Sequence, residues 1–301
     1  MRAVRLALLI SLAAVAQAAA APHVRTEPMS YGQFKALVQP AAELRLPYGK
    51  DPSQFGELWL PRGPGPHPVV VMIHGGCWTA SVAGLGIMNL AAQDLARRGL
   101  AVWNIEYRRV DQPGGGYPGT FQDVAAAIDH LRVLAPRYRL RLDRVVAVGH
   151  SAGGHLGLWA AARGRLPPAS PLRAAKPVPV ASVVSLGGLA DLQALQASGA
   201  HGCGSEPFAP LTGKPTPARP DVFADTSPAA LLPFGARQVS IHAELDRIAP
   251  VAAGQAYTDK ARASGAPAEF QVERGAGHFE LITPGTPAWE DIARRIQSLA
   301  R

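Results

Sequence analysis

Ser151 is the residue of this chain whose surroundings best suit a nucleophile. The segment Gly149-His150-Ser151-Ala152-Gly153-Gly154 stands between a β-branched apolar run at 144–148 and a helix-forming run at 156–162. A serine at such a tight strand-to-helix turn exposes its hydroxyl, and the flanking glycines let the strand and the helix approach each other closely. Because a G-x-S-x-G match alone would arise by chance in about one of seven chains this rich in glycine, the strand and the helix carry the inference. They predict a nucleophilic serine for acyl transfer.

A serine hydroxyl needs a base that takes its proton and a carboxylate that orients this base. His278, in the glycine-flanked turn 275–278, is the expected base, whereas His242 lies at the end of a predicted buried strand and better suits packing. Asp246 is the expected carboxylate; Glu244 is the first alternative, before Asp191 and Asp225. The chain order Ser, Asp, His agrees with one of the known serine-triad folds and differs from two others.

A second glycine-rich segment, His74-Gly75-Gly76-Cys77-Trp78, follows the apolar run 69–73. Together with the serine turn it resembles the α/β-hydrolase superfamily, in particular its esterase, lipase and arylformamidase (kynurenine formamidase-like) branch, whose H-G-G-x-W or H-G-G-G loop follows the third strand. The resemblance implies an oxyanion hole formed by the backbone N–H groups of Gly76, Cys77 and Ala152.

Two aromatic residues beside these motifs, Trp78 and Phe279, are the expected substrate contacts. For Trp78, packing beneath a lid is an equally good alternative. Cys77 stands where many esterases of this branch have a third glycine, so we expect its side chain to narrow the acyl pocket. Arg108 and Asp123 are expected to hold loops through buried polar contacts rather than to take part in the chemistry.

The elements that must position these residues indicate the α/β-hydrolase fold, since short apolar runs alternate with helix-forming segments. This alternation predicts a mostly parallel sheet, eight-stranded by the resemblance, with helices on both faces and ligands at the carboxyl ends of the strands. We expect one domain over residues 21–301, with a small lid at about 191–234 between strands six and seven. The expected strands include 101–106, 144–148, 180–186, 238–243 and 268–273, and the expected helices are 88–98, 121–135, 155–162, 251–264 and 289–300.

The first 20 residues have the composition of a signal peptide. Arg2 and Arg5 precede a largely apolar run at 6–15, and Ala16-Gln17-Ala18 is a suitable cleavage site. The apolar run has about ten residues, whereas a bilayer-spanning helix needs about 20, so no stable membrane anchor is expected. The mature protein is therefore expected in the periplasm or outside the cell.

Cys77 and Cys203 are the two cysteines of the chain. An oxidising compartment permits a disulfide between them, which would tie the lid to the loop after strand three. Two separate thiols are the alternative, because a disulfide depends on the distance between the two α-carbons and the sequence alone does not specify it.

Composition and charge argue against several other functions. Hydrophobic residues make up 48% of the chain and charged residues 17%, which suits a folded core. The formal net charge of +8 comes from scattered basic residues without a run of five or more, so nucleic-acid binding is not expected. The sequence has no recognised metal-binding or phosphate-binding motif, and no cofactor is expected.

These features predict an exported serine hydrolase that cleaves a small-molecule carboxylic ester through a Ser-His-Asp triad and an acyl-enzyme. An arylformamidase or other amide hydrolase is the first alternative, and an acyltransferase that uses the same intermediate is the second. A non-catalytic binding protein on the same scaffold is the least expected, because such proteins usually lack a triad residue and this chain has a candidate for each.

Overall fold

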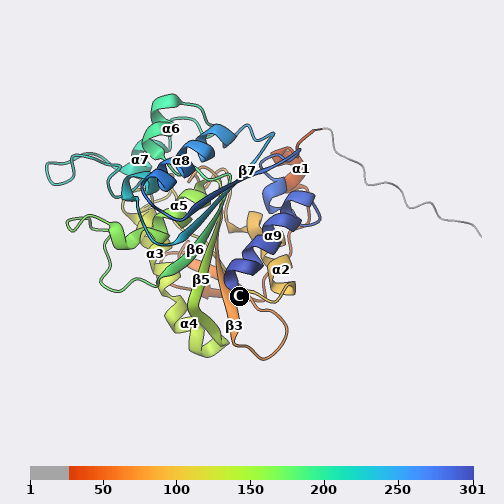
Figure 1. Ribbon diagram of the computed structural model, residues 1–301. Coiled ribbons are helices and arrows are strands. Elements are labelled where there is room, and N and C mark those ends of the chain that lie inside the picture. The colour runs from red at the N-terminus through yellow and green to blue at the C-terminus, as the bar shows by residue number, and fades with distance from the viewer. Residues whose placement is uncertain (1–26) are drawn as a thin grey trace, which may run out of the picture.

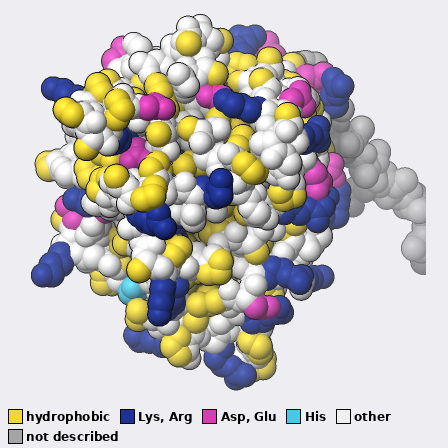
Figure 2. Space-filling model, turned by 60° about the vertical axis from the view of Figure 1, so that its left-hand side comes forward, with side chains coloured by type: hydrophobic (Ala, Val, Ile, Leu, Met, Phe, Trp, Pro, Cys, Tyr) yellow, Lys and Arg dark blue, Asp and Glu magenta, His cyan; other side chains and the backbone are white. Residues whose placement is uncertain are grey.

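The computed structural model describes residues 27–301 (Figure 1). The predicted signal peptide, residues 1–20, lies outside the described residues. In the part that is described, no helix is both long and apolar enough to cross a bilayer. Figure 2 shows Lys and Arg side chains spread over the visible face rather than gathered into one patch.

The centre of the protein is one eight-stranded sheet. Its strands are β1 (Leu44–Pro47), β2 (Phe55–Trp59), β3 (His67–Ile73), β4 (Ala101–Ile105), β5 (Leu140–His150), β6 (Val180–Leu186), β7 (Arg237–Ala243) and β8 (Ala268–Glu273). They lie in the order β1-β2-β4-β3-β5-β6-β7-β8. β1 and β2 pair antiparallel with their neighbours, and the other six strands run parallel. The central strands are buried on both faces, which explains their continuous apolar sequences. The predicted mostly parallel sheet is confirmed.

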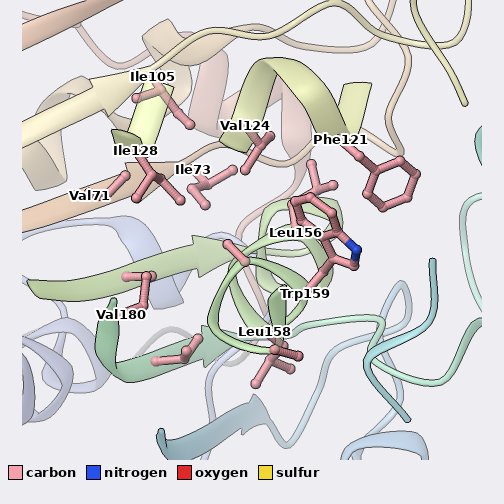
Figure 3. Close-up of a cluster of buried hydrophobic side chains, with 14 of the residues drawn as sticks. Val71, Ile73, Ile105, Phe121, Val124, Ile128, Leu156, Leu158, Trp159 and Val180 are labelled. Carbon is pink, nitrogen blue, oxygen red and sulfur yellow. The ribbon is translucent and has the colours of Figure 1, made fainter. Parts of the chain in front are cut away.

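Helices cover both faces of this sheet. The α-helices in residues 27–301 are α1 (Tyr31–Lys35), α2 (Asn89–Arg97), α3 (Gly119–Asp129), α4 (Leu131–Tyr138), α5 (Ala152–Ala161), α6 (Leu192–Ser198), α7 (Phe208–Thr212), α8 (Val251–Ala263) and α9 (Pro287–Ala300). α2 and α9 pack on one face, and α3, α5 and α8 pack on the other (Figure 1). Figure 3 shows the apolar cluster on the face of the sheet that α3 and α5 cover. In this cluster the ring centroids of Phe121 and Trp159 lie 4.9 Å apart. Each face therefore has its own hydrophobic cluster.

Some elements differ from the sequence prediction. The expected helix 121–135 is two helices, α3 and α4, which meet at His130. Close to this junction the Ala127 carbonyl accepts a hydrogen bond from the indole N–H of Trp103. The strand expected at 144–148 extends over all of β5, because it pairs with β3 on one side and β6 on the other. The short helices α1, α6 and α7 were not expected.

The chain between β6 and β7, residues 187–236, contains α6 and α7. Figure 1 shows these helices near the carboxyl ends of the central strands. The loops that follow β3, β5 and β7 leave the sheet at this same edge, as parallel strands require. The topology therefore brings the sequence motifs and the insertion after β6 to one end of the sheet.

Candidate active site

Ser151 stands in the sharp turn between β5 and α5. Its backbone has φ 56° and ψ −121°, a region that residues other than glycine rarely adopt, and its N–H donates to the Leu186 carbonyl at 2.8 Å. The neighbouring glycines are sterically required. A Cβ on Gly149 would lie 2.0 Å from the Gly153 carbonyl oxygen, and a Cβ on Gly153 would lie 2.1 Å from the Ile73 carbonyl oxygen. This close approach holds the serine at the carboxyl edge of the sheet.

Asp246 and His278 form a hydrogen-bonded pair. Asp246 Oδ2 lies 2.6 Å from His278 Nδ1, and Asp246 Oδ1 accepts the N–H groups of Ile248 and Ala249 at 2.7 and 2.9 Å. Burial alone would raise the pKa of Asp246, but the bond to His278 and the two amides hold this pKa below its usual value. The ionised carboxylate orients the ring with Nδ1 protonated, which leaves Nε2 able to accept a proton.

The alternative acid and base are occupied elsewhere. Glu244 pairs with Arg274 at 2.6 Å on the surface. His242 is buried, and its Nδ1 lies 3.2 Å from a backbone carbonyl oxygen. The structure therefore joins Asp246 to His278, and neither alternative residue takes part in this pair.

Ser151 and His278 line one cavity of about 560 Å³. Within residues 27–301 the Ser151 hydroxyl makes no hydrogen bond, so the two side chains share the cavity without being joined to each other. A largely apolar cavity with a few polar groups at one point is typical of a small-molecule site. The apolar part of its wall includes Val82, Ile87, Val110, Pro207, Pro210, Ile248 and Phe279.

The loop after β3 has an unusual backbone conformation beside the serine. Gly76, Cys77 and Trp78 have positive φ angles of 106°, 51° and 56° in succession, and the first two residues line the cavity. Among the described residues, no acceptor takes the N–H of Gly76 or Cys77. The N–H of Ala152 belongs to the first residue of α5 and so has no acceptor within the helix. Within residues 27–301, these three N–H groups, the expected oxyanion hole, have no competing acceptor.

His74 supports this loop from inside the protein. Its Nδ1 lies 2.7 Å from the Gly75 carbonyl oxygen, and its Nε2 lies 2.8 Å from Glu106 Oε1. Burial would raise the pKa of Glu106, but the adjacent His74 and Arg109 side chains lower it to about 2. Glu106 is therefore an ionised anchor for the loop, a role that the sequence motifs did not indicate.

Trp78 is fully buried and is not among the residues that line the cavity, which disagrees with the expected substrate contact. Its Nε1 donates to Nδ1 of His155 at 3.2 Å, and Nε2 of His155 donates to the Thr226 carbonyl at 2.8 Å. Burial lowers the pKa of His155 to about 4, which agrees with the neutral ring that this bonding pattern requires. Trp78 thus takes the alternative packing role, whereas Phe279 does line the cavity.

Cys77 and Cys203 form a disulfide, with their α-carbons 5.4 Å apart. The bridge joins the loop after β3 to the segment between α6 and α7, and both cysteines line the cavity. The structure thus contains the bridge rather than two separate thiols.

Arg108 and Asp123 have the structural role expected of them. The guanidinium binds both carboxylate oxygens of Asp123 at 2.7 Å, and Asp123 is buried. This ion pair joins the loop after β4 to α3. In the described part of the chain, no group of three His, Cys, Asp or Glu side chains is arranged to hold a metal ion.

His150 and Tyr31 also belong to the cavity wall. From the sequence, His150 is expected at most to orient the serine turn or to line the pocket. The His150 ring packs against that of His278, with centroids 4.3 Å apart, and burial holds the pKa of His150 well below its ordinary value. His150 precedes Ser151 in the motif, so its proximity had a sequence signal. Tyr31 comes from α1, and its hydroxyl donates to the Val82 carbonyl at 2.5 Å. No motif surrounds Tyr31, and only tertiary packing reveals it.

Comparison with protein families gives one match. A family model described as BD-FAE matches residues 57–260, which is more than half of the chain. The matched range contains Ser151 and Asp246 and ends before His278. Comparison with curated proteins gives no match.

Several solved structures are similar over most of their length. The truncated form of a carbohydrate esterase from gut microbiota is 22% identical, with a TM-score of 0.71 over 87% of this chain and 97% of that one. Inhibited esterase B from Lactobacillus rhamnosis is 21% identical, with a TM-score of 0.70 over 86% of each chain. Thermogutta terrifontis esterase 2 phosphoramylated by tabun is 17% identical, with a TM-score of 0.67 over 90% of this chain and 96% of that one. At these identities the similarity establishes the fold, which is the predicted α/β-hydrolase fold.

Proposed function

The chain belongs to the BD-FAE family, and from this membership and the geometry of its cavity we propose that it is a serine carboxylic-ester hydrolase. The observation that carries the proposal is the bond of 2.6 Å between His278 and the ionised Asp246, at the cavity that Ser151 also lines. A base oriented in this way, beside a serine in a strand-to-helix turn, is what acyl transfer requires. The similar solved structures are described as esterases, which supports the same chemistry.

In the first step, His278 Nε2 removes the hydroxyl proton of Ser151 while Oγ attacks the carbonyl carbon of the ester. The carbonyl oxygen becomes an anion, and the free N–H groups of the oxyanion hole bind it, each contributing about 3 kcal/mol. The bond between the carbonyl carbon and the alcohol oxygen then breaks. The alcohol leaves with the proton that His278 carried, and the acyl group remains on Ser151.

In the second step, water cleaves the acyl-enzyme. His278 takes a proton from the water, whose oxygen attacks the acyl carbon. The bond to Oγ breaks, Ser151 regains the proton, and the carboxylic acid is released. Asp246 stays ionised throughout and stabilises the imidazolium that forms in each step.

We also propose that the protein works outside the cytoplasm. The signal-peptide composition of residues 1–20 is the first support. The disulfide between Cys77 and Cys203 is the second, because oxidising compartments preserve such bonds. Expression in a bacterial host, fractionation and N-terminal sequencing test this: full-length protein retained in the cytoplasm would contradict export.

Hydrolysis of short p-nitrophenyl esters tests the main proposal. Replacement Ser151→Ala is expected to lower kcat by at least about 10³-fold without loss of folding, because the nucleophile is removed. A folded Ser151→Ala protein with nearly wild-type activity would refute the triad. Acetylated sugars belong in the panel because one similar structure is described as a carbohydrate esterase.

The same panel separates the alternatives that share this acyl-enzyme. Preferential turnover of N-formylkynurenine would assign an arylformamidase. Formation of a new ester when an alcohol competes with water would assign an acyltransferase.

A further inference from the structure

A second cavity of about 550 Å³ lies beside the catalytic cavity. Tyr31, Ala83 and Ile87 occur in the walls of both cavities, so these three side chains form the partition between them. Tyr31 is much the largest of the three. It belongs to the N-terminal arm, residues 28–37, which precedes β1 and lies outside the range that the family model matches.

The ring of Tyr31 is held in place by directional contacts. Its hydroxyl donates to the Val82 carbonyl at 2.5 Å, and its ring stacks on that of Phe279 with centroids 5.3 Å apart and an interplanar angle of 21°. The ammonium group of Lys35 lies 4.8 Å from the ring centroid. The ring therefore spans the space between the residue that follows His278 and the loop after β3.

Other contacts seat the arm independently of this ring. Phe34 is 1% exposed and stacks on Phe279 with centroids 5.3 Å apart. The N–H of Met29 donates to Glu280 Oε1 at 2.5 Å, and Met29 is itself buried. Truncation of Tyr31 is therefore expected to open the partition while the arm stays on the protein.

We propose that Tyr31 is a specificity-determining residue that closes the catalytic cavity on the side of the arm. It limits the length of the substrate group that points toward the arm. The second cavity continues behind it. Its wall combines apolar side chains, among them Phe55 and Leu85, with the polar and charged side chains of Lys35, Gln39, Arg45, Glu57 and Glu106. The apolar part suits an aliphatic or aromatic extension that starts at Tyr31. This inference rests on the proposed ester hydrolysis.

The experiment compares Tyr31→Ala with wild type on two substrate series. One series lengthens the acyl chain of p-nitrophenyl esters from acetate to dodecanoate, and the other lengthens the alcohol of acetate esters. The quantity compared is the ratio of kcat/KM for the longest ester to kcat/KM for the shortest. In one of the two series, Tyr31→Ala is expected to raise this ratio about tenfold or more over wild type, since each buried methylene favours binding. The responsive series identifies which half of the substrate faces the arm. Tyr31→Phe is the matched control, because it keeps the ring and is expected to keep the wild-type profile.

An unchanged profile in both series, from a Tyr31→Ala protein with wild-type thermal stability, would overturn the inference. An equal loss of activity on every substrate would also overturn it, because Tyr31 would then support the His278 loop rather than limit length. Should Tyr31→Ala not fold, Tyr31→Leu applies the same test, since it keeps apolar contact with Phe279. A wild-type protein without Ser151-dependent ester hydrolysis is a different outcome, which would refute the proposed function itself.

Discussion

Asp246 Oδ2 and His278 Nδ1 lie 2.6 Å apart, while Glu244 on the same loop binds Arg274 instead. Asp246→Asn is therefore expected to lower kcat for p-nitrophenyl acetate by roughly 10³- to 10⁴-fold, because an amide N–H opposite Nδ1 favours the wrong tautomer of His278. Glu244→Gln is the matched control and is expected to leave kcat nearly unchanged. Similar losses in the two variants, measured at pH 7.5, would contradict the assignment of the acid.

Two glycines of α5 are expected to respond oppositely to the same substitution. A Cβ on Gly153 would lie 2.1 Å from the Ile73 carbonyl oxygen, whereas the nearest contact of a Cβ on Gly157 is Val183 Cγ1 at an ordinary 3.5 Å. Gly153→Ala should therefore lower the free energy of unfolding by about 3 kcal/mol or more through overpacking. Gly157→Ala should leave it unchanged or raise it by up to about 1 kcal/mol, because alanine favours helix. Urea denaturation measures the free energy of unfolding of both variants. Equal destabilisation would contradict the close packing of the turn at Gly153.

The disulfide is expected to contribute to stability chiefly by restricting the unfolded chain. Its cysteines are 126 positions apart. A loop of this length corresponds to about 4 to 5 kcal/mol in the chain-entropy model. A reductant should therefore lower the melting temperature of the wild-type protein. The double variant Cys77→Ser/Cys203→Ser should melt at the same temperature with or without reductant. If the reductant lowered the melting temperature of both proteins equally, its effect would not come from reduction of this disulfide.

His155 is expected to make the protein less stable in mild acid. Its pKa in the folded protein is about 4, below the ordinary value of about 6.5, so the unfolded chain takes up a proton first as the pH falls. The free energy of unfolding should decrease from about pH 6.5 down to about pH 4, with about 2 kcal/mol lost at pH 5. His155→Gln offers an amide donor to Thr226 and an amide acceptor to Trp78 without titrating. Denaturation at pH 7.5 and pH 5.0 should show a smaller loss for the variant, and equal losses would exclude His155 as the cause.

The sequence was sufficient for the residues whose positions depend on local turns and strand ends. Ser151 and Asp246 each follow an apolar run that forms a strand, His278 follows the alternating strand β8, and parallel strands end at one edge of a sheet. Their placement at one edge of the sheet could therefore be predicted from chain order.

Roles that depend on distant partners could not be predicted in this way. Trp78 lies outside the cavity wall, where its indole N–H donates a hydrogen bond to His155. The two residues are 77 positions apart, and neither residue type specifies that bond. Tyr31 enters the cavity wall by stacking on Phe279 near the other end of the chain. The single helix expected at 121–135 was wrong for a similar reason, because the helix periodicity carries no mark of the junction at His130.

Because Cys77 and Cys203 both line the cavity, the shape of the pocket depends on how the protein was produced. A preparation from the reducing cytoplasm of an expression host would carry two thiols at this point, whereas an exported preparation would carry the bridge. The two samples would share the same folded domain and differ at the surface that meets the substrate. Substrate profiles from different laboratories would then be comparable only after the mass of the alkylated protein has shown the oxidation state of this pair.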